Sequence, residues 1–190
     1  MIITFGGSPG SGKSTIATRL AKALGYKRFY MGQIFRDVAK KRGMTMEEFG
    51  KHCEMNPETD REVDAYQAML GKQRKKFVIE GRTSYHFIPH AVKIYLYVTT
   101  HVGSQRILAD MKKNRKRNEV RSVQSLASFE RTVKRRMESE RRRYKKWFGI
   151  NPFMRSNYDL YVDTTKLTKE QVYSRVVGFL RTKGLSVPKK

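Results

Sequence analysis

The stretch "GGSPGSGKST", residues 6–15, decides the fold of this chain. It sets Gly7, Gly12, Lys13 and Ser14 in the pattern GxxxxGK followed by Ser or Thr, between a short β-branched run and a helical pattern. Glycines at these positions let backbone N–H groups surround phosphate oxygens, and the helix N-terminus adds its positive end. The lysine reaches the outer phosphates, and the serine hydroxyl can bind Mg²⁺. We therefore predict a loop that binds the triphosphate of a nucleotide.

The residues that we predict to bind this triphosphate are those of the loop itself. They are Gly7, Ser8, Pro9, Gly10, Ser11, Gly12, Lys13, Ser14 and Thr15. The loop alone does not define the reaction, because hydrolysis, transfer to a hydroxyl and transfer to another phosphate all begin from a bound triphosphate.

Beyond the loop, strand-like and helical patterns alternate along the chain. The runs "RFYMG", "KFVIEGR", "VKIYLYV" and "YDLYVDTT" are expected to be parallel strands, the longer of them covered on both faces. Thr45 and Glu48 form a capping box, and Asn56 as N-cap with Pro57 at the first helical position is a strong helix start. A final helix is expected from about residue 169 to residue 181. This order predicts an α/β fold with one parallel sheet of about five strands, flanked by helices.

Composition restricts the class of protein. At 190 residues the chain fits one compact domain, and its 11% aromatic residues argue against disorder. The single cysteine, Cys53, cannot form an internal disulfide, which favours a reducing compartment. The chain opens on a strand-like run rather than a signal peptide, and its longest apolar run is too short to span a membrane. We therefore expect a soluble, cytoplasmic protein, and we expect it to be a monomer.

Charge is distributed unevenly along the chain. The sequence has 41 Lys and Arg against 17 Asp and Glu, a net charge of +24 that attracts polyanions and predicts nonspecific affinity for nucleic acid. Much of the excess falls in a long segment expected to be helical, residues 104–148. Its part from 112 to 146 holds 15 Lys or Arg and four Glu.

Two arginines stand where a second phosphate could bind. A hydroxyl acceptor is helped by a carboxylate that takes its proton, whereas a phosphate acceptor needs positive groups that hold two anions together. Arg82 comes directly after the strand "FVIE", at the edge where open parallel sheets bind ligands, and Arg36 follows the second predicted strand. Arginine suits this position because its planar fork grips phosphate through two hydrogen bonds.

Five stretches spread over nearly the whole chain resemble the archaeal cytidylate kinases, a group of nucleoside monophosphate kinases. They are "MIITFGGSPGSGKSTIATRLAKALG", "YMGQIFRDVAKKRGMTMEEFGKHCEMNPETDREVDAYQ", "VIEGRTS", "RMESERRRYKKWFGI" and "YDLYVDTTKLTKEQV". The resemblance implies a P-loop NTPase fold, a phosphotransferase activity from ATP to CMP and usually dCMP, and Mg²⁺ as cofactor. Residues 1–190 would form a single kinase domain with three parts. These are a core (1–30, 76–110 and 157–190), a helical acceptor-binding region (about 31–75) and a basic helical and lid segment (about 111–156).

The same resemblance assigns roles to individual residues. Arg36 and Arg82 would hold the acceptor phosphate. Asp60, Asp64 and Gln67, spaced i, i+4, i+7 on one helix face, would line the acceptor pocket, although a solvated face with charges at that spacing is an equal alternative.

The lid arginines Arg136 and Arg143, seven residues apart, would act on the transferring phosphoryl group together with Lys13. Arg142 lies next to this pair and stays an alternative.

Two further assignments come from the resemblance. Glu80 would hold Mg²⁺ through water, beside the direct ligand Ser14, and residues 165–167 would pass near the adenine. The stretch "MKKNRKRNEVRSVQS" is longer and more basic than in the family, so that Arg106 and Arg115 are assigned to no site.

Two other functions stay open at this stage. One keeps the chemistry and changes the acceptor to AMP, UMP or another small metabolite. The other is a nucleic-acid-binding ATPase, suggested by the charge of +24, although the chain has no RNA-recognition motif and no aromatic residues interleaved with its basic run.

Overall fold

Five parallel strands form the central sheet. The computed structural model describes residues 1–73, 75–113 and 123–188. The strands are β1 (Ile2–Gly7), β2 (Lys27–Tyr30), β3 (Phe77–Glu80), β4 (Val92–Tyr97) and β5 (Leu160–Asp163). Their order in the sheet is β2-β3-β1-β4-β5, so that β1, which leads into the phosphate loop, lies in the centre. The prediction of a parallel sheet of about five strands is confirmed.

The apolar strand runs supply two cores, one on each face of the sheet. In β1, Ile3 and Phe5 pack into the core on one face, while Ile2 packs into the core on the other. Val78 and Ile79 of β3 divide in the same way. Strands that are buried on both faces must be apolar at nearly every position, which explains why the sequence lacks strict alternation.

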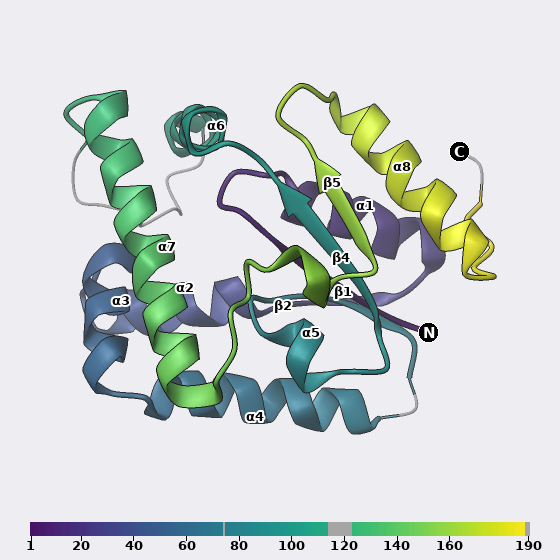
Figure 1. Ribbon diagram of the computed structural model, residues 1–190, viewed down its shortest axis with the longest axis horizontal. Coiled ribbons are helices and arrows are strands. Elements are labelled where there is room, and N and C mark those ends of the chain that lie inside the picture. The colour runs from purple at the N-terminus through teal and green to yellow at the C-terminus, as the bar shows by residue number, and fades with distance from the viewer. Residues whose placement is uncertain (74, 114–122, 189–190) are drawn as a thin grey trace.

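Helices cover both faces (Figure 1). α1 (Lys13–Leu24) and α8 (Lys169–Thr182) pack on one face, and α2 (Met31–Lys41), α4 (Glu58–Lys72) and α5 (Ser84–Phe87) on the other. The remaining helices are α3 (Met46–Met55), α6 (Thr100–Lys113), α7 (Leu126–Phe148) and the short 3₁₀ turn η1 (Arg155–Asn157). α7 runs along α3, at the side of the molecule away from α8.

The basic segment differs from its prediction. Residues 123–125 are not helical, so the described part of the segment from 104 to 148 is divided between α6, described to Lys113, and α7, which begins at Leu126. Ser125 caps α7 through a reciprocal pair of hydrogen bonds with Ser128, and Gly149, with φ of 69°, ends it. The core between α6 and α7 is small and apolar, built on Ile107, Phe129 and Val133.

Of two predicted helix starts, the one at Asn56 is wrong and the one at Thr45 is confirmed. Asn56 does not cap α4: its side-chain amide donates instead to the His52 carbonyl oxygen, 3.0 Å away, and closes the end of α3. The residue that precedes α4 is Pro57. The capping box of Thr45 and Glu48 at the start of α3 has both of its hydrogen bonds.

None of the helices in the described parts of the chain combines the length and the apolar character that crossing a membrane requires.

Candidate active site

The phosphate loop joins β1 to α1 at the carboxyl edge of the sheet. Gly7, Gly10 and Gly12 have φ of 148°, 75° and 85°, backbone conformations that glycine adopts without strain. The ammonium group of Lys13 folds back over the loop and donates to the carbonyl oxygens of Gly7 (3.0 Å) and Ser8 (2.8 Å). The conformation that the motif requires is therefore present, with the lysine at the centre of the loop.

Glu80, at the end of β3, lies directly beside the loop. The hydroxyl of Ser14 donates to its Oε2 at 2.7 Å, and Nε of Arg28 donates to its Oε1 at 2.5 Å. Arg28 is a diagonal neighbour of Glu80 across the β2–β3 pair, where Tyr30 is the residue directly opposite. Glu80 is buried, and both of its oxygens are hydrogen-bonded.

A cluster of two arginines and one carboxylate faces Lys13. Nε of Arg82 donates to Oε2 of Glu140 at 2.7 Å, and Nε of Arg136 donates to Oε1 of the same carboxylate at 3.1 Å. Arg82 also donates from Nη1 to the Gly7 carbonyl oxygen. The cluster thus joins the phosphate loop, the end of β3 and helix α7 at one point.

Protonation equilibria in this cluster reflect the crowding of positive charge. Burial, and next the guanidinium of Arg82, lower the pKa of Lys13 well below its usual range. Burial alone would raise the pKa of Glu140, but Arg82, Arg136 and Arg143 lower it to about 2. Glu140 is therefore ionised throughout the neutral range, and it is the negative group around which the arginines gather.

The face of α4 that carries Asp60, Asp64 and Gln67 is buried, not solvated, which excludes the alternative of a surface face. Gln67 Nε2 donates to Asp64 Oδ1 at 2.6 Å and to the Thr83 hydroxyl oxygen at 2.9 Å. The Thr83 hydroxyl donates to the same Asp64 oxygen at 2.5 Å, and Ser84 donates to Oε1 of Gln67.

This network leaves one carboxylate oxygen without a partner in the described structure. Asp64 Oδ2 is buried and accepts no hydrogen bond there. Burial raises the pKa of Asp64 to about 7, while Thr83 and Gln67 act in the opposite direction. A buried oxygen of this kind is a ready acceptor for a ligand N–H group.

The two predicted lid arginines meet different partners. Arg136 belongs to the Glu140 cluster, whereas Nε of Arg143 lies 2.5 Å from Asp60 Oδ2 and its Nη1 donates to the Gly50 carbonyl oxygen at 3.3 Å. Both partners of the Arg143–Asp60 pair are buried. Arg143 therefore lies against α3 and α4, and Arg36 is half-buried on α2.

A family model described as cytidylate kinase-like matches residues 2–166. This chain belongs to the cytidylate kinase-like family.

Similar proteins agree with that membership. The chain is 33% identical to a cytidylate kinase of Archaeoglobus fulgidus over 191 aligned residues, which cover 100% of both chains. It is 38% identical to a cytidylate kinase of Pyrococcus abyssi, covering 93% of this chain and 91% of the relative.

Solved structures support the fold alone, because the identities are low. A shikimate kinase of Acinetobacter baumannii, bound to shikimate, matches 97% of this chain and 95% of its own with a TM-score of 0.60 and 15% identity. An uncharacterised protein of Eubacterium ventriosum matches with a TM-score of 0.69 and 13% identity, covering 96% of this chain and 99% of that one. The predicted P-loop kinase fold is confirmed.

Around the site of this cytidylate kinase-like protein, helix α7 is held to α3 by surface ion pairs. Arg135 lies 2.9 Å from Glu47, and Arg142 lies 3.0 Å from Glu54. The partners are seven residues apart on both helices, so the helices run side by side in the same direction. Arg142, the alternative to the predicted lid pair, points to this surface and is 64% exposed.

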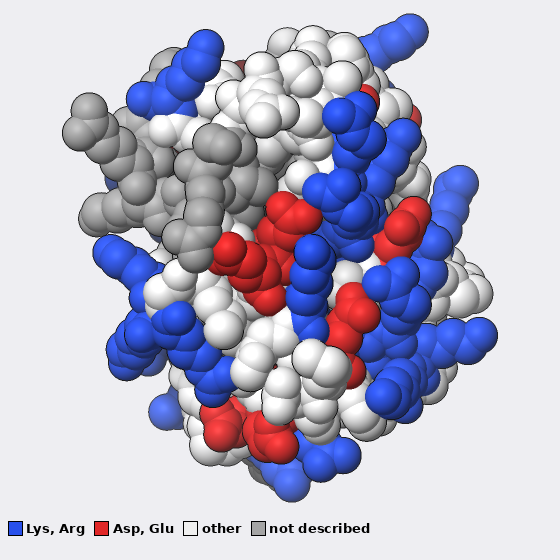
Figure 2. All heavy atoms as spheres, turned by 90° about the vertical axis from the view of Figure 1, so that its left-hand side faces the viewer, with Lys and Arg blue, Asp and Glu red and all other residues white. Residues whose placement is uncertain are grey.

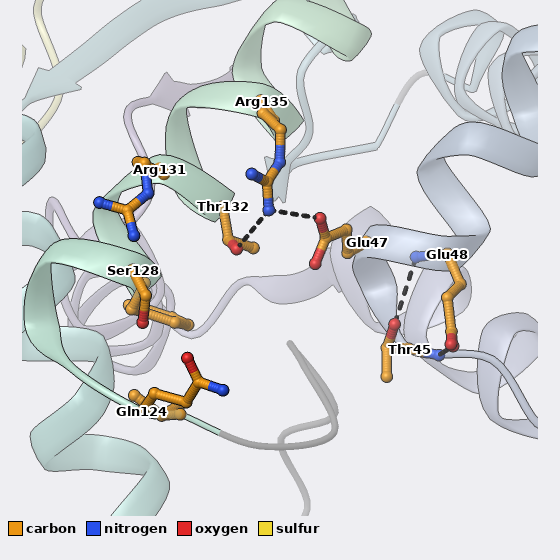
Figure 3. A pocket seen from close by; sticks show the side chains of 10 residues that line it. Thr45, Glu47, Glu48, Gln124, Ser128, Arg131, Thr132 and Arg135 are labelled. Atoms are coloured by element: carbon orange, nitrogen blue, oxygen red, sulfur yellow. Dashed lines mark hydrogen bonds and ion pairs between the residues drawn. The ribbon is translucent and has the colours of Figure 1, made fainter.

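A hollow of about 370 Å³ opens between α3 and the first turns of α7 (Figure 3). Arg135 crosses it to reach Glu47, and it also donates to Thr132 on its own helix. Arg131 and Glu48 line the same hollow, so acidic and basic groups face it together. This mixture does not mark it as an anion site.

The loop after β5 is fixed to the phosphate loop. The Thr164 hydroxyl lies 3.2 Å from the Ser11 carbonyl oxygen, and Nη2 of Arg106 donates to the Thr164 carbonyl oxygen at 2.9 Å. Residues 165–167, predicted to pass near the adenine, follow directly. Arg106 thus fixes the position of this loop, and Arg115 lies outside the described residues.

Sequence reasoning missed four residues of the site. Thr83 and Ser84 follow Arg82 at the sheet edge, a position that could have identified them. Glu140 shares a helix face with Arg136 and Arg143. Arg28 gave no signal, since its contact with Glu80 depends on the order of strands in the sheet.

Proposed function

We propose that this chain transfers the γ-phosphoryl group of ATP to CMP, and to dCMP, producing the diphosphate. The observation that carries the proposal is the convergence of Lys13, Arg82 and Arg136 on one point beside the phosphate loop. Membership of the cytidylate kinase-like family supports CMP as the acceptor.

The positive cluster suits a phosphate acceptor. The attacking oxygen of a monophosphate is already deprotonated, so the enzyme needs charge neutralisation and alignment more than a general base. Lys13 would hold the outer phosphates of ATP in the loop formed by residues 7–15. Arg82, with Arg36, would hold the acceptor phosphate, and Arg136 would neutralise charge that develops during transfer.

Ser14 and Glu80 fit Mg²⁺. They bring a hydroxyl and a carboxylate oxygen within 2.7 Å of each other, and hard oxygen donors of this kind are what Mg²⁺ prefers. Ser14 and Glu80 would hold Mg²⁺, and the chemistry that the ion would supply is positive charge that neutralises part of the charge of the phosphates. Glu80 would act through water, because Arg28 and Ser14 already hold both of its oxygens.

The buried face of α4 would recognise the base. Asp64 has an unpartnered buried oxygen, and the cytosine edge carries an amino group that can donate to it. Gln67 is fixed beside it by Ser84 and Thr83. Asp60 and Arg143 would close this side of the acceptor pocket as a neutralised pair.

A coupled assay with ATP, Mg²⁺ and each of CMP, dCMP, UMP and AMP tests the proposal. CMP should give the highest kcat/KM, because an acceptor that leaves buried polar groups unpaired loses several kcal/mol of transition-state binding. A preference for AMP or UMP would change the acceptor and keep the kinase, whereas no turnover of any monophosphate would remove the proposal.

Three related properties are part of the proposal. The enzyme would act as a monomer, which size-exclusion chromatography with light scattering measures. A reducing compartment such as the cytoplasm suits the single buried Cys53. Its positive surface would bind nucleic acid without sequence preference and without effect on turnover.

A further inference from the structure

Glu140 is a carboxylate within the group of cations that would receive the acceptor phosphate. It is 6% exposed, and its two oxygens accept from two different arginines, Arg82 at 2.7 Å and Arg136 at 3.1 Å. One arginine follows the end of β3, and the other lies on α7, so the carboxylate connects the core to the helix. Phosphate and carboxylate compete for the same guanidinium hydrogen atoms, because each is an oxyanion that can accept two hydrogen bonds from one guanidinium at once.

The contacts of Arg82 place this competition at one edge of its guanidinium. A guanidinium offers two edges for a two-bond grip, one formed by Nε and Nη2 and the other by Nη1 and Nη2. Nε of Arg82 is bonded to Glu140, and Nη1 is bonded to the Gly7 carbonyl oxygen. The Nε–Nη2 edge therefore has one hydrogen already engaged by Glu140, and a phosphate that takes two bonds from that edge must displace this carboxylate.

Charge also favours Glu140 as the group that is displaced. A phosphate monoester that enters this cluster brings about two negative charges, and an ionised carboxylate beside it repels them. The Gly7 carbonyl is neutral and belongs to the loop that holds the donor, so an incoming phosphate repels it less than it repels the Glu140 carboxylate.

We propose that Glu140 is a positioning residue that competes with the acceptor phosphate for Arg82 and Arg136, and so sets how tightly the acceptor binds. The inference rests on the proposed function, because it takes a phosphate monoester as the ligand of these two arginines. Release of the arginines by Glu140 would then accompany acceptor binding, and recapture would help the product to leave.

The decisive variant is Glu140→Gln, which keeps the size of the side chain and removes its charge. We expect the KM for CMP, and the inhibition constant of inorganic phosphate against CMP, to fall on the order of tenfold, the equivalent of one charge-assisted hydrogen bond. The kcat should not rise. Cytidine, which has the base and sugar without the phosphate, should bind to the variant and to the parent equally.

Glu138→Gln is the matched control. Glu138 is exposed on the same helix, so its substitution changes the net charge by the same amount without touching the cluster. Both constants should stay within about twofold of the parent, as for a surface charge. A similar fall in both variants would mean that net charge alone is responsible, and it would overturn the inference.

Other results also decide the question. Weaker or unchanged binding of CMP and phosphate in Glu140→Gln, in a protein whose parent turns CMP over, would overturn the inference and leave the proposed function intact. If the variant unfolds more easily, inorganic phosphate should raise its Tm by more than that of the parent, because two arginines then lack their carboxylate. An equal or smaller rise would count against competition.

Discussion

Both sides of helix α7 carry basic residues, but those on the inner side are ion-paired and those on the outer side are exposed. The inner side presents Arg136, Glu140 and Arg143, spaced i, i+4, i+7. Glu140 forms ion pairs with Arg136 and Arg82, and Arg143 forms an ion pair with Asp60. The outer side presents Arg131, Lys134 and Lys145, whose side chains are exposed and make no hydrogen bond or ion pair within the described chain.

Figure 2 shows the exposed charges on this face of the molecule, with a column of Lys and Arg and with Asp and Glu gathered beside it. Arginine content alone therefore says little about function in this helix. What distinguishes the two sides is the set of acids and carbonyl groups that the fold places opposite each residue.

The largest expected difference between the two sides is in catalysis. Replacing Arg136 by Gln should lower kcat on the order of 10³-fold, because a positioned arginine that neutralises charge in phosphoryl transfer contributes at least that much. Replacing its outer neighbour Lys134 by Gln should leave kcat within about twofold, since an exposed charge contributes little. Initial rates with saturating ATP and CMP measure both. Equal losses in the two variants would show that the inner side has no special role.

The next difference is in stability, and it contrasts two adjacent arginines. Arg143→Met leaves Asp60 buried without its partner, which should lower the free energy of unfolding by about 3 kcal/mol. Arg142→Met removes only an exposed pair with Glu54 and should cost less than about 1 kcal/mol. Urea unfolding followed by circular dichroism gives both values. A cost for Arg143→Met as small as that for Arg142→Met would argue against a buried ion pair.

The third contrast concerns the pH dependence of stability, and it involves the buried carboxyl groups of α4. Burial raises the pKa of Asp64 to about 7, above its value in an unfolded chain, so the folded state binds the proton more tightly. Stability from this group is therefore present at low pH and lost as pH rises through the window from about 4 to 7. Burial also raises the pKa of Asp60, against the effect of Arg143, to about 6.

Asp64→Asn tests this contrast directly. Relative to the parent, its free energy of unfolding should increase by on the order of 2–3 kcal/mol between pH 4.5 and pH 7.5. Glu140 titrates with the opposite sign and below this window, since its pKa is lowered to about 2. Urea unfolding at four pH values checks the prediction, and a difference between variant and parent that does not change with pH would contradict it.

Much of the fold could be predicted from the sequence because its signals are local. The phosphate loop needs glycines within one short stretch, and the capping box of Thr45 and Glu48 is completed within four residues. The failure at Asn56 is also local in origin: its side chain had two helix ends within reach and bonded to the earlier one, at His52.

The candidate site could be predicted only in part, since its contacts join distant parts of the chain. Spacing placed Arg136 and Arg143 on one face of a helix, but it could not say that Glu140 and Asp60 would be their respective partners. The contact of Arg28 with Glu80 likewise needs β2 to lie next to β3, and strand order is a property of the whole sheet.

The smallest expected effect concerns the outer side. A variant with Gln at Arg131, Lys134 and Lys145 should bind a labelled 20-nucleotide single-stranded RNA less tightly and with a weaker dependence on salt. Each phosphate contact contributes about 0.7 to the slope of log K against log[salt], so three lost contacts lower it by about 2. The control variant carries Gln at Lys22, Lys169 and Arg175, exposed residues of α1 and α8 with the same total charge. Fluorescence anisotropy from 50 to 200 mM salt measures both, and kcat for CMP should not change in either. If both variants lose the same slope, the affinity belongs to the net charge of +24 and not to α7.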